Sequence, residues 1–475
     1  MQETRPSRDL PLSSPFLGPV WKVLDVPFVL KRVAILIVSI AFVPALSWLI
    51  VHAQKSRPSD FAFFDSAIYL TLLLGGIAIV LSLVVPFAVG LNRNALARLF
   101  GPTVRIVTLA VGLGVILQGV LVAATIIRAE TQTLGSVHVN LVLILGGGGI
   151  LVGIAVLMAS LTFLKRAPMA VLGHTLVREE EPSFFTFLDG LAGRLGASLP
   201  DHVVVGLEPT FYVTSEPISL AGSDKILHGE TLYLSLPLCR VLKKEELAAV
   251  IGHELGHFIG KDTAYSRKFA PAFVRLGRTL TASQTATGWS ALYSIPVQAI
   301  LGLCLYEFSK AASRIGRERE FEADIVGARA ASPTDLGTSL LKVGLYSRLW
   351  GEVLGNTVSV LNKGRAYTNL SDFFQHCCLN AFSGSKGQLL AVALDEGAIS
   401  HPVDTHPPTS ARLDRMGVRQ DMISSEILAP DGEDRSITLF HRASAYEEGL
   451  STLQQQWLVA AGHARPPEEA APRSR

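Results

Sequence analysis

The chain carries a His-Glu-x-x-His motif at residues 253–257, within the run VIGHELGHF. Positions four apart on a helix lie one turn apart on the same face, so His253 and His257 can direct two imidazole nitrogens at one metal ion. Zinc in a hydrolytic site takes three protein ligands and keeps an open position for water, whose pKa it lowers. Glu254 lies beside that position, where a carboxylate can accept a proton. The motif therefore predicts metal-assisted hydrolysis.

The surrounding residues favour a helix that packs into a core. Apolar residues recur at near-helical spacing through the motif, at Leu247, Val250, Ile251, Leu255 and Phe258. Upstream, residues 230–238 alternate apolar and polar side chains and predict a strand, which could hold an extended peptide by main-chain hydrogen bonds. The alternative is a core helix whose two histidines hydrogen-bond to carbonyl groups.

Candidates for a third ligand lie downstream, in the run GREREFEADIVG of residues 316–327. Glu320 and Asp324 are four apart on a predicted helix, so one carboxylate could bind the metal while the other orients a ligand histidine. Glu318 and Glu322 compete for the same role, and spacing alone does not choose among the four. Without the first motif, an exposed charged helix would be the better explanation of this run.

The His-Glu-Leu-Gly-His motif and the Glu-Phe-Glu-Ala-Asp segment at residues 320–324 together resemble the HtpX and CAAX-prenyl-protease family of membrane zinc metallopeptidases. The resemblance covers roughly residues 180–420. It implies one zinc ion per chain, with Glu320 as the third ligand and Asp324 as the aspartate that supports a ligand. The chain has Gly316-Arg317 where the family usually has Ser-Arg, and its counterpart of the family's edge segment is altered, but no ligand position is lost.

A third segment, DTHPPTSARLDRM at residues 404–416, is similar to the His-Pro segment of the same family. The resemblance implies that His406 lies near the zinc and helps to stabilise the tetrahedral oxyanion, and that Arg412 anchors the segment. A donor aimed at a developing negative charge is what acyl-transfer chemistry requires. The simpler interpretation is a loop braced by its prolines.

Composition independently predicts a membrane protein. Hydrophobic residues make up 49% of the chain and charged residues only 17%, below the roughly 25% typical of soluble domains. Four long apolar runs account for this, at residues 33–54, 66–92, 106–127 and 137–164. Each is long enough to cross about 30 Å of hydrocarbon as a helix. The glycines at 146–149 would allow a neighbouring helix to approach closely.

The basic residues predict the orientation of these runs. They cluster before the first run and after the second, at Arg5, Arg8, Lys22, Lys31, Arg32, Arg93, Arg98 and Arg105. The third loop has only Arg128. We therefore expect a multi-pass protein of the cell inner membrane, with its N-terminus and catalytic domain in the cytoplasm. The four cysteines lack zinc-knuckle spacing and fit a reducing compartment.

Residues 289–308 form a further apolar run between the two zinc motifs. A single crossing there would place Glu320 on the opposite side of the membrane from His253, so the two could not share an ion. We therefore expect a packed, interfacial or re-entrant helix, broken at Pro296. A hairpin with two crossings is the alternative.

The predicted fold class is mainly α, with a four-helix transmembrane domain and a helical zincin-type metallopeptidase domain that contains a small β-sheet. The expected divisions are a cytoplasmic arm at 1–30, the membrane domain at 31–166 and the peptidase domain at 170–425. The peptidase domain includes an insert at about 345–400. Residues 426–475 form a C-terminal extension that is disordered at its end. A net charge of +2 and the lack of a Gly-rich phosphate loop give no support for a nucleic-acid partner.

These features predict a membrane-bound zinc endopeptidase whose substrates are polypeptides, chiefly damaged or misassembled membrane proteins. CAAX-type processing of prenylated proteins is the enzymatic alternative, although four N-terminal spans are fewer than that branch usually has. A membrane scaffold or chaperone with a structural zinc site is the alternative from another class. Glu254 argues against the scaffold, because a structural zinc site does not require that carboxylate. The sequence does not indicate an oligomeric state.

Overall fold

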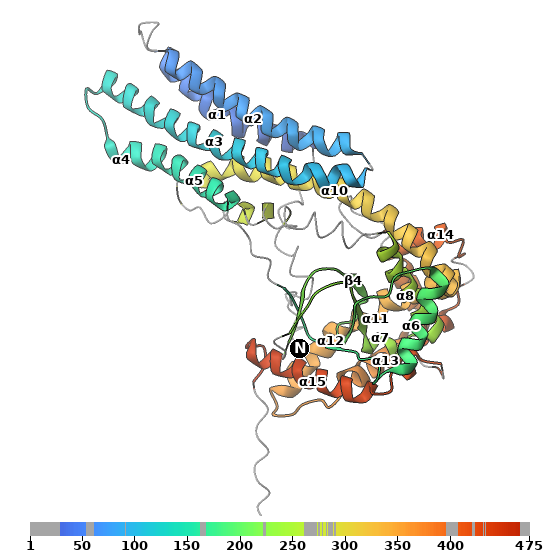
Figure 1. Ribbon diagram of the computed structural model, residues 1–475. Helices are drawn as coiled ribbons and strands as arrows, with labels where there is room; N and C mark the ends of the chain where they lie inside the picture. Colours follow the sequence, from blue (N-terminus) through green and yellow to red (C-terminus); the bar gives the residue numbers. More distant parts are fainter. Residues whose placement is uncertain are drawn as a thin grey trace, which may run out of the picture. The chain divides into compact units, whose positions relative to one another are not determined.

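The computed structural model describes residues 29–53, 61–90, 92–161, 168–221, 225–260, 291–395, 407–419, 423–430, 432 and 434–465, with isolated positions between 273 and 288. Helices dominate both parts of the chain (Figure 1). The chain forms two compact units. Residues 13–165 and 268–315 make up one unit, and the remaining residues make up the other. We call them the membrane unit and the peptidase unit, after the two domains that the sequence predicts.

The membrane unit contains helices that are long and apolar enough to span a bilayer. They are α1 (Val29–His52), α2 (Ala62–Val89), α3 (Arg93–Thr133), the combined α4 (Val139–Leu141), η3 (Val142–Gly147) and α5 (Gly148–Leu161), and the first part of α10 (Ala291–Ala330). In the described residues there are thus five candidate spans, where the sequence predicted four. The chain is an integral membrane protein by this criterion.

The fifth candidate comes from the run at 289–308, which enters the continuous helix α10. The expected break at Pro296 is wrong, because this proline is only the sixth residue of the helix and its missing N–H removes a single hydrogen bond. Aromatic side chains of α10 pack against neighbouring helices both before and after Pro296. The ring of Phe308 lies 4.6 Å from that of Phe100 on α3, and Tyr293 contacts the backbone position of Gly149. The run thus packs against α3 and the fourth span, and it is also long and apolar enough to be a span itself, so the expected interfacial or re-entrant position stays a prediction.

Glycines bring α3 and the fourth span into close contact, as the sequence predicted for residues 146–149. A Cβ atom added at Gly119 would lie 2.6 Å from the carbonyl oxygen of Gly146. One added at Gly153 would lie 2.7 Å from the carbonyl oxygen of Gly112. Only glycine, which has no Cβ atom, fits where these two backbones meet.

The peptidase unit contains two small sheets, where the sequence predicted one. The four-stranded sheet has the order β2-β3-β7-β4, and its strands are β2 (Gly173–Thr175), β3 (His202–Gly206), β7 (Thr231–Ser235) and β4 (Tyr212–Thr214). Strands β3 and β7 are parallel, and the two edge strands are antiparallel to their neighbours. The second sheet joins β1 (Met169–Val171), β5 (Ile218–Leu220) and β6 (Ile226–Leu227).

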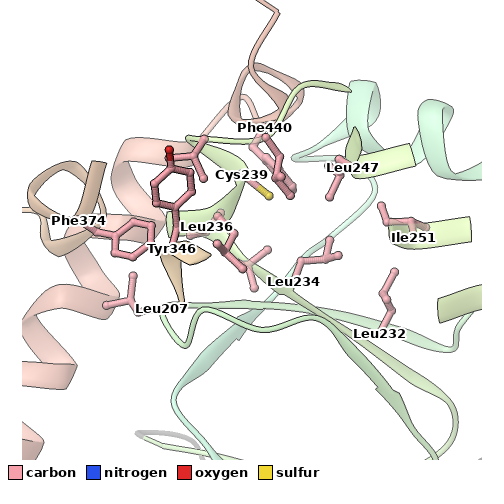
Figure 2. Close-up of a cluster of buried hydrophobic side chains, with 14 of the residues drawn as sticks. Leu207, Leu232, Leu234, Leu236, Cys239, Leu247, Ile251, Tyr346, Phe374 and Phe440 are labelled. Atoms are coloured by element: carbon pink, nitrogen blue, oxygen red, sulfur yellow. The ribbon is translucent and has the colours of Figure 1, made fainter. Parts of the chain in front are cut away.

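Helices cover the four-stranded sheet and form most of the rest of the peptidase unit. They are α6 (Pro182–Leu195), α7 (Leu236–Cys239), α8 (Lys244–Ile259), α11 (Pro333–Tyr346), α12 (Leu349–Leu361), α13 (Leu370–Asp395), α14 (Thr409–Arg415) and α15 (Ala443–Ala460), together with the end of α10. Figure 2 shows Leu232 and Leu234 of β7 near Leu247 and Ile251 of α8, all fully buried. The expected insert at 345–400 contributes α12 and α13, and Phe374 of α13 belongs to this same core.

Candidate metal centre

Helix α8 presents the His-Glu-x-x-His motif, and its start is fixed by a buried carboxylate. Glu246 accepts a hydrogen bond from the backbone N–H of Lys243 at 2.8 Å, in the manner of a capping box. The Nζ atom of Lys342, on α11, lies 2.9 Å from the same carboxylate, and both side chains are almost completely buried. The helix that carries the motif is therefore tied to α11 by an ion pair.

The glycines of α8 allow it to pack tightly against the end of α10. A Cβ atom added at Gly252 would overlap the side chain of Ala330, and one added at Gly256 would lie 3.0 Å from the Cα atom of Ala323. This close approach brings the carboxylates of residues 316–330 within reach of the histidines on α8. Because Gly256 has no side chain, α8 can approach α10 closely at the metal-binding motif.

His253, His257 and Glu320 converge on one point. The Nε2 atoms of the two histidines are 3.3 Å apart, and each lies 3.6 Å from a carboxylate oxygen of Glu320. Three donors about 2.0–2.1 Å from a tetrahedral zinc ion lie roughly 3.3 Å from one another. Two imidazoles and one carboxylate therefore fit zinc in both chemistry and spacing, and the set could hold a metal ion.

Asp324 orients the first of these histidines. Its Oδ1 atom lies 3.0 Å from Nδ1 of His253, which leaves Nε2 of the same ring directed at the other two ligands. Arg412 donates to the other carboxylate oxygen from Nε at 2.9 Å, and its Nη1 atom lies 3.8 Å from Glu320. Such outer contacts fix the tautomer and the ring orientation of a metal ligand.

Arg412 remains charged although its side chain is only 10% exposed. Burial lowers the pKa of this guanidinium, but hydrogen bonds to Asp324 and its negative charge outweigh burial and raise the pKa overall. A buried arginine that pairs with a buried carboxylate avoids the penalty of an isolated charge. Helix α14 is thereby attached to α10 directly beside the histidines.

Glu254 follows His253 on α8 and is 8% exposed. Among the described residues, no side chain donates a hydrogen bond to its carboxylate. A carboxylate without a fixed donor beside a metal position is available to accept a proton from water.

The structure distinguishes among the acidic residues of the 316–327 run. Glu320 meets the histidines, whereas Glu318 is 52% exposed and lies 3.4 Å from Arg415. Glu322 is also exposed. His406 lies outside the described residues. The buried pair of Glu246 and Lys342 was missed by the sequence analysis, although a lone lysine within the apolar run SLLKVGLY was a signal for it.

Comparison with known proteins shows that part of the chain matches one protein family. Residues 220–419 match the family described as Peptidase family M48. The chain is 25% identical over 277 residues to a protein named Protease HtpX homolog from Pyrobaculum calidifontis. This match covers 55% of this chain and 75% of the relative. It is 29% identical over 172 residues to a protein of the same name from Archaeoglobus fulgidus, covering 35% of this chain and 48% of the relative.

The match to the Archaeoglobus protein thus spans about half of that relative's length. No solved structure matches the chain. The family match includes both halves of the candidate metal centre, and the candidate spans add the membrane domain. Residues 220–419 are therefore similar to peptidase family M48, and the chain as a whole is similar to the HtpX-like membrane metallopeptidases.

Proposed function

We propose that this protein is a zinc endopeptidase that cleaves peptide bonds in membrane proteins. One observation carries the proposal: His253, His257 and Glu320 meet within 4.8 Å, and Glu254 lies next to them on α8. A structural zinc site requires four protein ligands and no adjacent base. Three donors beside a buried carboxylate are the arrangement of a hydrolytic site.

His253, His257 and Glu320 would hold the zinc ion. When bound there, the ion would act as a Lewis acid on the scissile carbonyl group and would lower the pKa of a water molecule. Asp324 accepts a hydrogen bond from the Nδ1–H group of His253 and so keeps Nε2 as the ligand atom. Arg412 holds Asp324 in this position.

Glu254 would act as the general base and then as the general acid. Its carboxylate accepts a proton from the attacking water and later gives that proton to the leaving amine. His406 would donate a hydrogen bond to the oxyanion that forms during attack. The family resemblance supports the roles of both residues.

We infer that the substrates are misassembled or damaged membrane proteins, that the enzyme acts in the inner membrane, and that its catalytic domain is cytoplasmic. The names of the relatives support a protease, and the candidate membrane spans support substrates that lie in or at the membrane. The distribution of basic residues supports the orientation.

Replacing Glu254 with Gln tests the mechanism. The amide keeps the size of the side chain but cannot accept the proton, so peptide hydrolysis should fall by at least about 100-fold while zinc stays bound. Glu245→Gln is the matched control, because Glu245 lies on the same helix and is exposed. Undiminished hydrolysis by the Glu254 variant would refute the mechanism. Substrates trapped by this variant would then identify the proteins that the enzyme cleaves.

A further inference from the structure

A cavity of about 480 Å³ lies between the edge strand β2 and helix α15. Its lining includes all three residues of β2, Leu220 at the end of β5, and one face of α15 from Arg442 to Leu453. None of these residues belongs to the candidate metal centre. Helix α15 also lies beyond the residues that match the peptidase family. We call this cavity the β2–α15 groove.

The hydrogen-bonding groups of β2 that face away from the sheet are available in this groove. Leu176, directly after β2, donates its N–H to the carbonyl oxygen of Val203 at 2.9 Å. Antiparallel pairs alternate between bonded and non-bonded positions, so His174 also faces β3, whereas Gly173 and Thr175 face outwards. In the described part of the chain, no hydrogen bond outside the β2–β3 pair involves the main-chain N–H or C=O groups of these two residues.

An open strand edge beside a helix can accept an extended peptide as an additional strand. Main-chain hydrogen bonds would come from Gly173 and Thr175. The face of α15 that borders the edge carries small residues, Ala445 and Gly449, which leave room for a further backbone. A Cβ atom added at Gly449 meets nothing within 4 Å. The groove is therefore wide enough at this point for side chains of a bound segment.

The side chains of the groove select the chemistry of the peptide. Leu220, Leu450 and Leu453 provide an apolar surface. Arg442 is the only lysine or arginine that lines the groove in the described residues, and none of the lining side chains is acidic. Its guanidinium contacts Glu180 at 2.6 Å, but it has five N–H donors and can serve a second carboxylate. The groove thus complements an apolar residue and an acidic residue on the same face of a strand.

We propose that the β2–α15 groove is a second peptide-binding site, which takes an extended segment with an apolar and an acidic residue two positions apart. Residues i and i+2 of a strand project to the same side, so both can enter the groove together. The occupant is an extended segment of a partner protein, and it is not cleaved. This inference does not depend on the catalytic role of the metal centre.

The test is binding of fluorescein-labelled heptapeptides Ser-Thr-x-Thr-z-Thr-Ser, with x as Val, Leu or Phe and z as Asp, Glu or Lys, measured by fluorescence polarisation. The full chain in detergent is used, with Glu254→Gln in every sample so that no peptide is cleaved. Peptides with Asp or Glu should bind at least about fivefold more tightly than those with Lys, and Arg442→Gln should remove this preference. Methylation of the main-chain amides that pair with β2 should weaken binding further.

Gly449→Leu should fill the groove and reduce binding of the acidic peptides by about tenfold or more. The matched control is Gly193→Leu on α6, because Gly193 is also an exposed helical glycine with nothing within 4 Å of an added Cβ. Both variants exchange Gly for a better helix former, so neither should unfold the chain. Equal binding by the Gly449 and Gly193 variants would place the peptide elsewhere and overturn the proposal. Lack of binding by all the peptides at about 1 mM would overturn it as well.

Discussion

The Nδ1 atom of His253 lies 3.0 Å from Oδ1 of Asp324, and this contact determines which nitrogen of the histidine can face a metal ion. Asp324 is itself held by Arg412 from α14. Three segments that are distant in the sequence therefore set the orientation of one ligand. The precision of the candidate site depends on this chain of contacts as well as on the ligands themselves.

Arg412→Gln should weaken zinc binding by about 10- to 100-fold, because loss of the guanidinium leaves Asp324 without its charged partner and loosens His253. Competition with a chromophoric chelator measures the affinity. Arg415→Gln is the control on the same helix, since Arg415 is 52% exposed and pairs only with the exposed Glu318 among the described acidic residues. Equal affinities of the two variants would show that Arg412 does not support the site.

Metal analysis of the purified protein should give about one zinc ion per chain, and a His253→Ala, His257→Ala double variant should lose it. Glu320→Gln should also lose most of the metal, whereas Glu318→Gln should retain it, because only Glu320 reaches the histidines. Removal of zinc by a chelator should abolish hydrolysis, and added zinc should restore it. Full occupancy in the double variant would disprove the ligand assignment.

Lys342→Met should lower the free energy of unfolding by about 3–5 kcal/mol, because it leaves the buried carboxylate of Glu246 without its partner. The double variant Lys342→Met, Glu246→Leu should recover much of this loss, since it removes both charges from the core. Thermal unfolding in detergent compares the two. A single variant that is as stable as the double variant would show that the pair does not stabilise the start of α8.

Gly119→Leu should lower the free energy of unfolding of the membrane unit by about 3 kcal/mol or more, because the side chain would collide with the backbone at Gly146 and Ile150. The control is Gly147→Leu, since a Cβ atom at Gly147 meets nothing within 4 Å. Unfolding of both variants in the same detergent gives the comparison. Similar stabilities would mean that α3 and the fourth span do not pack as closely as described.

Cysteine labelling should test the orientation across the membrane. Ser136 follows α3, Ser444 lies on α15, and both are exposed, so Ser→Cys changes at these positions are closely matched. Cys377, the one half-buried native cysteine, is first replaced by Ser. A membrane-impermeant maleimide added from outside intact cells should label residue 136 and leave residue 444 unmodified. The reverse pattern would invert the proposed topology.

Local patterns determined much of this protein. The spacing of His253 and His257 depends only on the helical repeat, and a helix forms there because the surrounding apolar residues have the same repeat. The long apolar runs predicted membrane helices because length and hydropathy suffice for that inference. The glycines at 146–149 likewise indicated a close helix contact, since they remove the side chains that would prevent it.

Tertiary structure decided what depends on contacts between distant segments. Glu318, Glu320 and Glu322 are equivalent in local sequence, and only the packing of α10 against α8 directs Glu320 at the histidines. The continuity of α10 through Pro296 depends on contacts with α3 and the fourth span that local rules for proline do not include. The β2–α15 groove likewise has no signature in the sequence, because its two walls are more than 250 residues apart. Proximity of this kind arises from packing of the whole unit, which the sequence periodicity does not encode.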